Sequence, residues 1–406
     1  MKLFRFSLCV LALLACCLPM SAAPAQAAVA SINLSPNSGP AGTTVKVTGT
    51  GFPKKTAGSV KAGTSSVAFT ASASGFFTVD VVIRATGDPV VSVQAIAGTA
   101  KAAAPFTFTN APEPAPGPPG PSQAPLRYGV GTPGGPLAAA ELDEVSALVD
   151  EAPSIILSYK DFNQAPPLQD LDAARTRGAE VLLTWEPWTW GGGTAQPAYS
   201  LDRITAGDFD PYLRQWGQAL AGWGHPVMLR FGHEMNGNWY PWSEQLNGNG
   251  AGDFVAAWRH VHDVVASTGA SNITWVWNPN VPYWGSTELG AVYPGSSYVD
   301  AVALDGYNWG ASTSSDWVSP SQLFGVGLTQ LRSLAPGKQI LIAETSSAEQ
   351  GGSKAEWNTS LISYLAAQGD VTAVLWFNFN KETDWRINSS AASADALRAA
   401  LASRPR

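Results

Sequence analysis

The sequence predicts a (β/α)8 (TIM) barrel of the α/β class, preceded by a small all-β sandwich. After residue 126, apolar runs of strand length alternate with helix-like stretches. Before residue 110, short runs recur without helices between them, and a proline-rich stretch separates the two regions. A chain of 406 residues is long enough for two domains of this kind.

The barrel prediction depends on the number of strand-like runs in the second region. They are Leu126–Val130, Ser154–Tyr159, Val181–Trp185, Val227–Phe231, Ile273–Trp277, Ala301–Asp305, Ile340–Ala343 and Val371–Phe377. The main helix-like stretches between or after them are Leu137–Val149, Phe209–Ala221, Phe254–Ala266, Pro320–Leu334, Ala355–Ala367 and Ala392–Leu401. Eight such strands are the number that closes a parallel barrel. A doubly wound open sheet is the alternative, but no glycine-rich phosphate loop follows the first run.

The first region is rich in Thr, Val, Ser and Gly, and turn signals separate its runs. The alternating runs are Thr44–Thr48, Phe77–Val81, Val90–Gln94 and Pro105–Thr109. Strands at this spacing without helices predict a small immunoglobulin-like β-sandwich. The segment from Ile32 to Phe52 resembles the start of immunoglobulin-like TIG modules, which implies a spacer or binding module.

The N-terminus has a basic start, an apolar stretch from Phe6 to Leu18, and small residues ending in Ala25-Gln-Ala27. This pattern predicts a signal peptide and a secreted, extracellular protein. Leu13-Leu-Ala-Cys16 also resembles a bacterial lipobox, so a lipid anchor on Cys16 at the cell surface is the alternative. Cleavage after Ala27 would remove all three cysteines, which are Cys9, Cys16 and Cys17.

Dense proline between the two regions favours extended polyproline II and predicts a semi-rigid linker. The predicted organisation is a signal peptide at 1–27, a sandwich at 31–110, a linker at 111–125 and a catalytic barrel at 126–406.

Composition excludes some partners and favours one. Charged residues make up 14% of the chain, the net charge is -7, and no basic patch occurs, so we expect no nucleic acid partner. A membrane partner is expected only if Cys16 is lipidated, and we expect a monomer. The chain has 16 Trp, and many follow the apolar runs. Aromatic rings stack on the apolar faces of sugars, so this excess fits a polysaccharide ligand, although packing is the other explanation.

Two glutamates stand at the ends of the fourth and seventh runs. Because side chains alternate along a strand, Arg230 and Glu234 should share an inward face, as should Ile342 and Glu344. Retaining glycosidases need two carboxyl groups about 5–5.5 Å apart. Either glutamate alone is explained by an ion pair at the barrel rim. The pair, surrounded by Trp, predicts glycosidic-bond hydrolysis.

The segment Arg230-Phe-Gly-His-Glu-Met-Asn-Gly-Asn-Trp-Tyr-Pro-Trp242 resembles the signature of glycoside hydrolase family 26. The resemblance covers Leu126 to about Ala402. That family consists of retaining, endo-acting (β/α)8 glycosidases, mostly β-1,4-mannanases, with mixed-linkage β-glucanases and β-1,3-xylanases. The resemblance therefore implies that Glu234 is the general acid/base and Glu344 the nucleophile of a secreted polysaccharide hydrolase.

The same resemblance implies further roles. His233 would contact the sugar near the scissile bond, Tyr307 would hydrogen-bond the nucleophile, and Trp376 would form the platform under the cleaved sugar. β-1,4-Mannan is the first expected substrate. Phe231 and the Glu344-Thr-Ser-Ser347 segment differ from the mannanase pattern. Mixed-linkage β-glucan and β-1,3-xylan therefore stay open as substrates. A non-catalytic polysaccharide-binding surface protein is an alternative of a different class, against which the presence of both carboxylates counts.

Aromatic residues near the two glutamates are candidates for sugar binding. Trp185 and Trp188 follow the third run, and either stack on sugars or pack in the core. Trp239, Tyr240 and Trp242 directly follow the acid/base candidate, and a loop with that much aromatic surface predicts a sugar platform.

Polar candidates complete the predicted site. Glu186 is either a sugar ligand or part of a rim ion pair, and Arg230 could hold Glu344 ionised. Weaker candidates for binding sugar hydroxyls are Asn278, Asn280, Asp305 and Asn308. The segment Asp384–Arg386 after the eighth run forms a loop that could reach the substrate. No group of His, Asp and Glu has the spacing of a metal site, so we expect neither a metal nor another cofactor.

Overall fold

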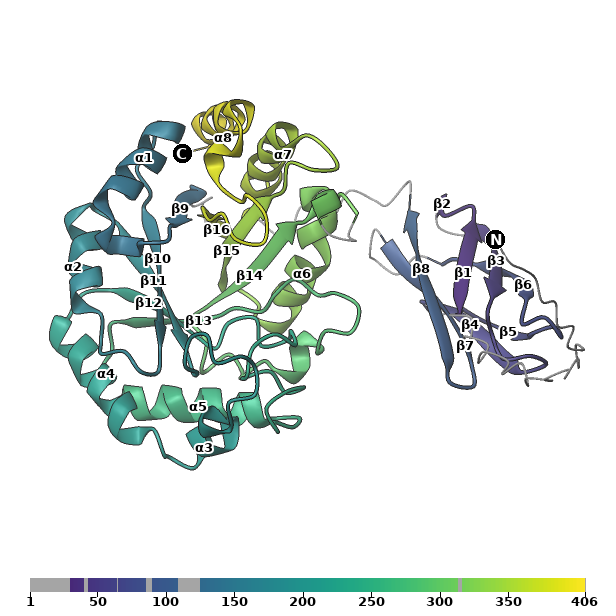
Figure 1. Ribbon diagram of the computed structural model, residues 1–406, viewed down its shortest axis with the longest axis horizontal. Helices are drawn as coiled ribbons and strands as arrows, with labels where there is room; N and C mark the ends of the chain where they lie inside the picture. Colours follow the sequence, from purple (N-terminus) through teal and green to yellow (C-terminus); the bar gives the residue numbers. More distant parts are fainter. Residues whose placement is uncertain are drawn as a thin grey trace, which may run out of the picture. The chain divides into compact units, whose positions relative to one another are not determined.

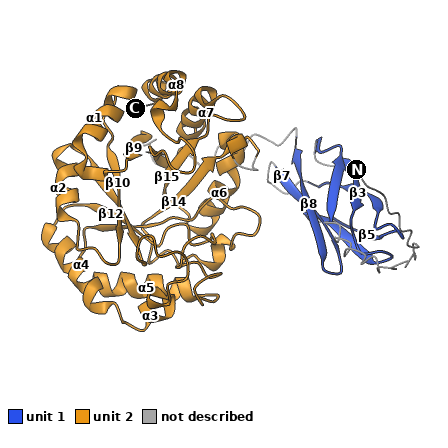
Figure 2. Cartoon of the chain, viewed as in Figure 1, with its two compact units in different colours: residues 1–117 blue, residues 118–406 orange. Residues whose placement is uncertain are grey.

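A computed structural model describes residues 30–39, 43–63, 65–84, 90–108, 125–312 and 316–405. The predicted signal peptide, with Cys16, lies outside the described residues, as does the predicted linker up to residue 124. The chain divides into two compact units, residues 1–117 and 118–406 (Figure 2).

The described residues of the smaller unit form two β-sheets. Its strands are β1 (Ser31–Ser35), β2 (Ser38–Gly39), β3 (Thr44–Thr50), β4 (Ala57–Ala62), β5 (Ser65–Thr70), β6 (Phe77–Val82), β7 (Val90–Ala97) and β8 (Ala100–Phe108). One sheet has the order β1-β3-β6 and the other the order β2-β8-β7-β4-β5. In β3 the buried residues Val45 and Val47 alternate with the exposed residues Thr44 and Lys46, as expected for a sheet with one face in the core. The all-β prediction for this region is therefore confirmed.

The larger unit is a closed parallel barrel. Within residues 125–312 and 316–405, eight strands close in the order of the sequence. They are β9 (Arg127–Gly131), β10 (Ile155–Asp161), β11 (Glu180–Glu186), β12 (Val227–Phe231), β13 (Ile273–Trp277), β14 (Ala301–Asn308), β15 (Gln339–Ser347) and β16 (Val371–Phe377). The predicted TIM barrel is confirmed, and each expected run overlaps one of these strands.

Helices surround the barrel strands (Figure 1). The α-helices are α1 (Ala139–Val149), α2 (Leu168–Thr176), α3 (Leu201–Thr205), α4 (Asp210–Trp223), α5 (Asp253–Ala266), α6 (Pro320–Leu334), α7 (Lys354–Ala366) and α8 (Ala391–Ser403). Short 3-10 helices are η1 (Gly135–Leu137), η2 (Pro197–Tyr199), η3 (Leu289–Ala291), η4 (Gly310–Ser312) and η5 (Ile387–Ser389). No helix among the described residues is long and apolar enough to cross a membrane.

Local sequence explains several helix boundaries. Ser319 and Gln322 form a capping box at the start of α6, and Pro320 occupies its first turn. Gly224 ends α4 in the left-handed conformation, with a φ of 74°. The helices α2 and α3 were not among the expected stretches. The connection from β13 to β14, described throughout, contains η3 in place of an α-helix.

Alternation along the strands gives the barrel two apolar layers. Side chains inside the barrel include Ile155, Leu157, Leu182, Met228, Val276, Ala301, Ala303, Leu341, Ala343, Ala373 and Leu375. The intervening residues pack outward against the helices. Ile342 belongs to the outer layer, so the prediction that it shares the inward face with Glu344 is wrong. The pairing of β15 with β16 shifts register between Ile342 and Thr345, and this irregularity interrupts the simple alternation before Glu344.

Candidate active site

Glu234 lies in a tight turn after β12. Gly232 and Glu234 both have left-handed backbones, with φ values of 51° and 53°. Glycine adopts this conformation readily, but glutamate rarely does. The N–H of Glu234 donates to the carbonyl of Asn278, with 2.8 Å between nitrogen and oxygen. The loop after β13 thus fixes a strained residue, and such strain is characteristic of functional sites.

The Glu234 carboxyl is buried, and each oxygen accepts one hydrogen bond. The indole of Trp239 donates to Oε2 across 2.7 Å, and the amide of Asn280 donates to Oε1 across 2.8 Å. Burial, followed by the nearby charge of Glu344, raises the Glu234 pKa to about 7, while the two donors oppose this change. A carboxyl group that keeps a proton near neutral pH can act as a general acid.

Glu344 has a different environment. Tyr159 donates to its Oε1 across 2.8 Å, and Tyr307 donates to Oε2 across 2.6 Å. Arg230 Nη2 also donates to Oε1 and forms an ion pair with the carboxylate. Hydrogen bonds and a positive charge both stabilise an ionised carboxylate. Glu344 is thus held as an oriented anion, which is the form that a nucleophile needs.

Arg230 lies inside the barrel, completely buried, and joins several strands. Its Nε donates to Thr184 Oγ1 at 2.6 Å, and its Nη1 donates to Asn278 Oδ1 at 2.9 Å. Nη1 also contacts Asp305 Oδ2 at 2.9 Å. Asn278 and Asp305 were weak candidates for sugar hydroxyls, but here they hold the arginine and are themselves fully buried.

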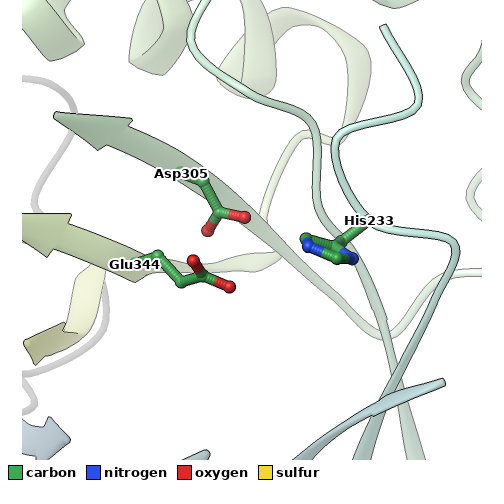
Figure 3. Close-up of side chains that lie close together, drawn as sticks. All are labelled: His233, Asp305 and Glu344. Carbon is green, nitrogen blue, oxygen red and sulfur yellow. The ribbon is translucent and has the colours of Figure 1, made fainter. Parts of the chain in front are cut away.

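His233, Asp305 and Glu344 bring potential metal-binding atoms within 4.8 Å of one another. Asp305 and Glu344 project from neighbouring strands, and His233 lies across from them (Figure 3). The guanidinium of Arg230 already contacts both carboxylates. A metal ion here would face that positive charge at close range, so the arrangement fits an ion-pair network better than a metal centre.

A third carboxyl group, Glu186 at the end of β11, lies near His233. The indoles of Trp188 and Trp190 donate to its Oε2 across 3.3 and 2.5 Å. Burial raises the Glu186 pKa to about 7. Burial, with the charge of Arg230, holds the His233 pKa well below its usual value, so the ring is neutral. His233 Nδ1 is 3.9 Å from Glu186 Oε1 and has no hydrogen-bond partner among the described residues.

For Trp185 the structure supports packing, which was the alternative to sugar stacking, and the predicted platform at Trp376 is wrong. Trp185 is fully buried in the outer layer, where it stacks on Trp216 with 4.5 Å between ring centroids. Trp376 is 1% exposed and also belongs to the outer layer. In both cases alternation along the strand directs the ring away from the barrel axis. Phe377, the next residue on β16, instead clusters with Tyr159 and Tyr307 near the nucleophile candidate.

The aromatic residues after Glu234 divide into a support and a surface. Trp242 is fully buried, so its predicted place in the sugar platform is wrong. It stacks beneath Tyr240 at 4.3 Å, and its indole donates to the His233 carbonyl. Tyr240 and Trp188 are half-buried, and Trp239 is 36% exposed. These three rings are accessible to a ligand.

Sequence reasoning missed Tyr159, Trp190, Tyr283 and Trp284. Tyr159 could have been found, because it follows Ile155 and Leu157 at alternate positions of one run and so shares their inward face. No pattern in the sequence placed Trp190 next to Glu186 or Tyr283 next to Trp239.

A closed barrel with two buried glutamates in contrasting environments has the architecture of a glycoside hydrolase. The model of glycosyl hydrolase family 26 matches residues 206–338. The match lies within the barrel and includes Arg230, His233 and Glu234.

Curated relatives match parts of the chain. It is 39% identical over 249 residues to endoglucanase H of Acetivibrio thermocellus, an alignment covering 59% of this chain and 26% of that protein. It is 34% identical over 90 residues to mannan endo-1,4-beta-mannosidase A and B of Caldalkalibacillus mannanilyticus, covering 21% of this chain and 17% of the relative. The chain thus spans about a quarter or less of these relatives' lengths.

Solved structures support the fold. A β-mannanase from a symbiotic protist of the termite Reticulitermes speratus is 18% identical, with a TM-score of 0.50, covering 69% of this chain and 88% of that one. The catalytic domain of a Bacillus sp. JAMB-750 GH26 endo-β-1,4-mannanase is 21% identical, also with a TM-score of 0.50, covering 68% and 84%.

Proposed function

We propose that this protein is a retaining endo-glycosidase that hydrolyses a β-linked polysaccharide. The observation that carries the proposal is the contrast between its two buried glutamates. Glu234 has a pKa raised to about 7, whereas Glu344 accepts hydrogen bonds from Tyr159, Tyr307 and Arg230. Two carboxyl groups whose environments differ in this way can divide the roles of acid and nucleophile.

In the first step, a Glu344 oxygen attacks the anomeric carbon and forms a glycosyl ester. The bond between that carbon and the glycosidic oxygen breaks, and Glu234 gives its proton to the departing oxygen. Ester formation removes the negative charge of Glu344, which is one cause of the raised Glu234 pKa. The Glu234 pKa therefore falls once the intermediate has formed.

In the second step, the ionised Glu234 takes a proton from water, and the water oxygen attacks the anomeric carbon. The ester bond to Glu344 breaks, which restores that carboxylate and leaves Glu234 protonated. Two displacements at one carbon retain its configuration. The charge of Glu344 thus couples the protonation of Glu234 to the stage of the reaction.

The surrounding residues would bind and orient the sugar. Tyr307 and Arg230 hold Glu344, as does Tyr159. His233 and Glu186 offer polar atoms to sugar hydroxyls. The accessible rings of Trp188, Trp239 and Tyr240 would stack on the apolar faces of pyranose units.

Two substrates fit this proposal. β-1,4-Mannan is the substrate expected from the sequence, and a relative named as a mannan endo-1,4-beta-mannosidase matches over 90 residues. A β-glucan is the second candidate, because the relative named endoglucanase H matches over 249 residues at 39% identity. We further propose that the protein is a monomer and that it is either secreted or anchored at the cell surface through Cys16. The sandwich would then be a spacer or a binding module.

The test measures reducing-sugar release from β-mannan, mixed-linkage β-glucan and xylan. Glu344→Ala should abolish release while leaving the thermal unfolding transition intact. Glu234→Ala should lose most activity on polysaccharides but much less on aryl glycosides with a strongly acidic leaving group, which departs without a proton. Near-normal release by the Glu344→Ala variant would overturn the assignment. Binding without release by the unchanged protein would favour a non-catalytic polysaccharide-binding protein.

A further inference from the structure

Among the described residues, Trp284 is the most exposed large apolar residue, with 86% of its surface accessible to solvent. Packing does not account for a tryptophan that is almost entirely in solvent. Its neighbour Tyr283 is 37% exposed and stacks on Trp239, with ring centroids 5.7 Å apart and planes inclined by 28°. Single exposed apolar residues are ordinary, but adjoining aromatic residues beside a candidate active site indicate a binding surface.

The turn that carries Trp284 is well defined. The N–H of Ser286 donates to the carbonyl of Tyr283 across 3.1 Å, and the Ser286 hydroxyl donates to the same carbonyl across 2.8 Å. Gly285 has a φ of 91°, and its place in this turn is the one at which a type II turn requires a positive φ. The backbone therefore holds the indole out from the protein.

The same loop is joined to the acid/base candidate. Asn280 donates to Oε1 of Glu234, and Trp239, which stacks on Tyr283, donates to Oε2. The side-chain amide of Asn236 donates through Nδ2 to the backbone carbonyl of Asn280 and accepts at Oδ1 from the Asn280 N–H. The backbone carbonyl of Asn236 accepts from the N–H of Thr287. The loops after β12 and β13 thus behave as one support beneath Trp239 and Tyr283.

The position of this surface relative to the two glutamates determines which part of a substrate it meets. The general acid of a glycosidase lies next to the leaving-group oxygen. Trp239 contacts Glu234, whereas the described hydrogen-bond partners of Glu344 are Tyr159, Tyr307 and Arg230. The aromatic surface therefore faces the leaving part of the chain.

We propose that Tyr283 and Trp284 form a stacking surface that extends the active site on the leaving-group side. This surface would bind the second and later sugars after the cleaved bond. This inference rests on the proposed function. The ligand is a β-linked polysaccharide or oligosaccharide with at least two pyranose units on the leaving side. Apolar ring faces of these units would stack on Trp284 and on the exposed part of Tyr283.

The experiment compares Trp284→Ala with the unchanged full-length protein on two kinds of substrate. On the polysaccharide that the enzyme cleaves, kcat/KM should fall about 3- to 10-fold, the range that one aromatic contact supplies. On an aryl β-glycoside, whose leaving group is a single small ring, kcat/KM should not change. Trp284→Phe should recover part of the loss, and Val326→Ala, at an exposed apolar residue of α6, should have no effect on either substrate.

A binding measurement separates this inference from the proposed function. In the Glu344→Ala background, affinity electrophoresis in gels containing β-mannan or mixed-linkage β-glucan should show weaker retention when Trp284→Ala is added. If the Glu344→Ala protein and the double variant are retained equally, the inference is overturned. The same holds if neither protein is retained. Equal losses of kcat/KM on both kinds of substrate would also overturn it. Absence of hydrolysis by the unchanged protein, with retention that depends on Trp284, would contradict the proposed function alone.

Discussion

The phenol of Tyr159 donates a hydrogen bond to Oε1 of Glu344 across 2.8 Å. A residue of β10 therefore holds a carboxylate that β15 carries on another side of the barrel. Tyr307 holds the other oxygen of the same carboxylate. Glu344 is thus oriented from two directions.

Tyr159→Phe removes this hydrogen bond and keeps the ring. A hydrogen bond to a charged group contributes about 1.5–3 kcal/mol, so kcat/KM should fall about 10- to 100-fold. Steady-state kinetics on an aryl glycoside will measure the loss. Tyr128→Phe is a matched control, because its buried hydroxyl has no hydrogen-bond partner among the described residues. Equal activity of the two variants would show that Tyr159 does not act through Glu344.

Activity should decline as the pH rises through the Glu234 pKa of about 7. The first step needs the protonated carboxyl group, and its population falls tenfold for each pH unit above the pKa. The pH profile of kcat/KM on a substrate with a poor leaving group measures this decline. The Glu234→Gln variant should lose the alkaline limb along with most of its activity. Full activity of the unchanged enzyme at pH 9 would contradict Glu234 as the acid.

Glu186→Gln should stabilise the protein at alkaline pH. Burial raises the Glu186 pKa from 4.5, its ordinary value, to about 7 in the folded protein. Between pH 4.5 and pH 7 the folded state therefore binds more protons than the unfolded state. Stability therefore decreases as the pH rises through this window, and the decrease is complete above pH 7. The corresponding free energy is roughly 3 kcal/mol. The Tm advantage of the variant should grow from pH 5 to pH 8, and a constant difference would refute the argument.

Arg230→Met should destabilise the barrel by about 3–5 kcal/mol, because it leaves two buried carboxylates without their cation. Adding Asp305→Asn to this variant should recover part of the loss, since it removes one of the uncompensated charges. Chemical denaturation of the single and double variants will measure both effects. If the two substitutions together cost as much as the sum of each alone, Arg230 and Asp305 do not stabilise each other.

The fold and the core of the site could be predicted because their signals are local. Apolar runs identified the barrel strands, and a contiguous segment placed His233 beside Glu234. The errors arose where orientation mattered. Trp185 and Trp376 lie at strand positions that face the helices. In a strand that is buried on both faces, alternation alone does not show which face points into the barrel.

The pairing of Arg230 with Asp305 shows a second limit. These residues are 75 positions apart in the sequence. They meet only because Arg230 on β12 and Asp305 on β14 both point their side chains toward the barrel axis. Asp305 follows Ala301 and Ala303 on the inward face of β14, but the register shift after Leu304 pairs it with Glu344 and leaves Ala343 of β15 unpaired in this ladder, so the alternation is interrupted on β15. Such irregularities depend on the packing of neighbouring strands, so no alternation rule applied to a single run could have predicted them.

The left-handed backbone of Glu234 implies a compromise between durability and chemistry. A residue other than glycine in this conformation costs on the order of 1–3 kcal/mol. A chain optimised for thermal endurance alone would place glycine or asparagine at this position. The glutamate persists at the expense of stability, so the surrounding barrel must supply enough free energy to keep one unfavourable residue in place.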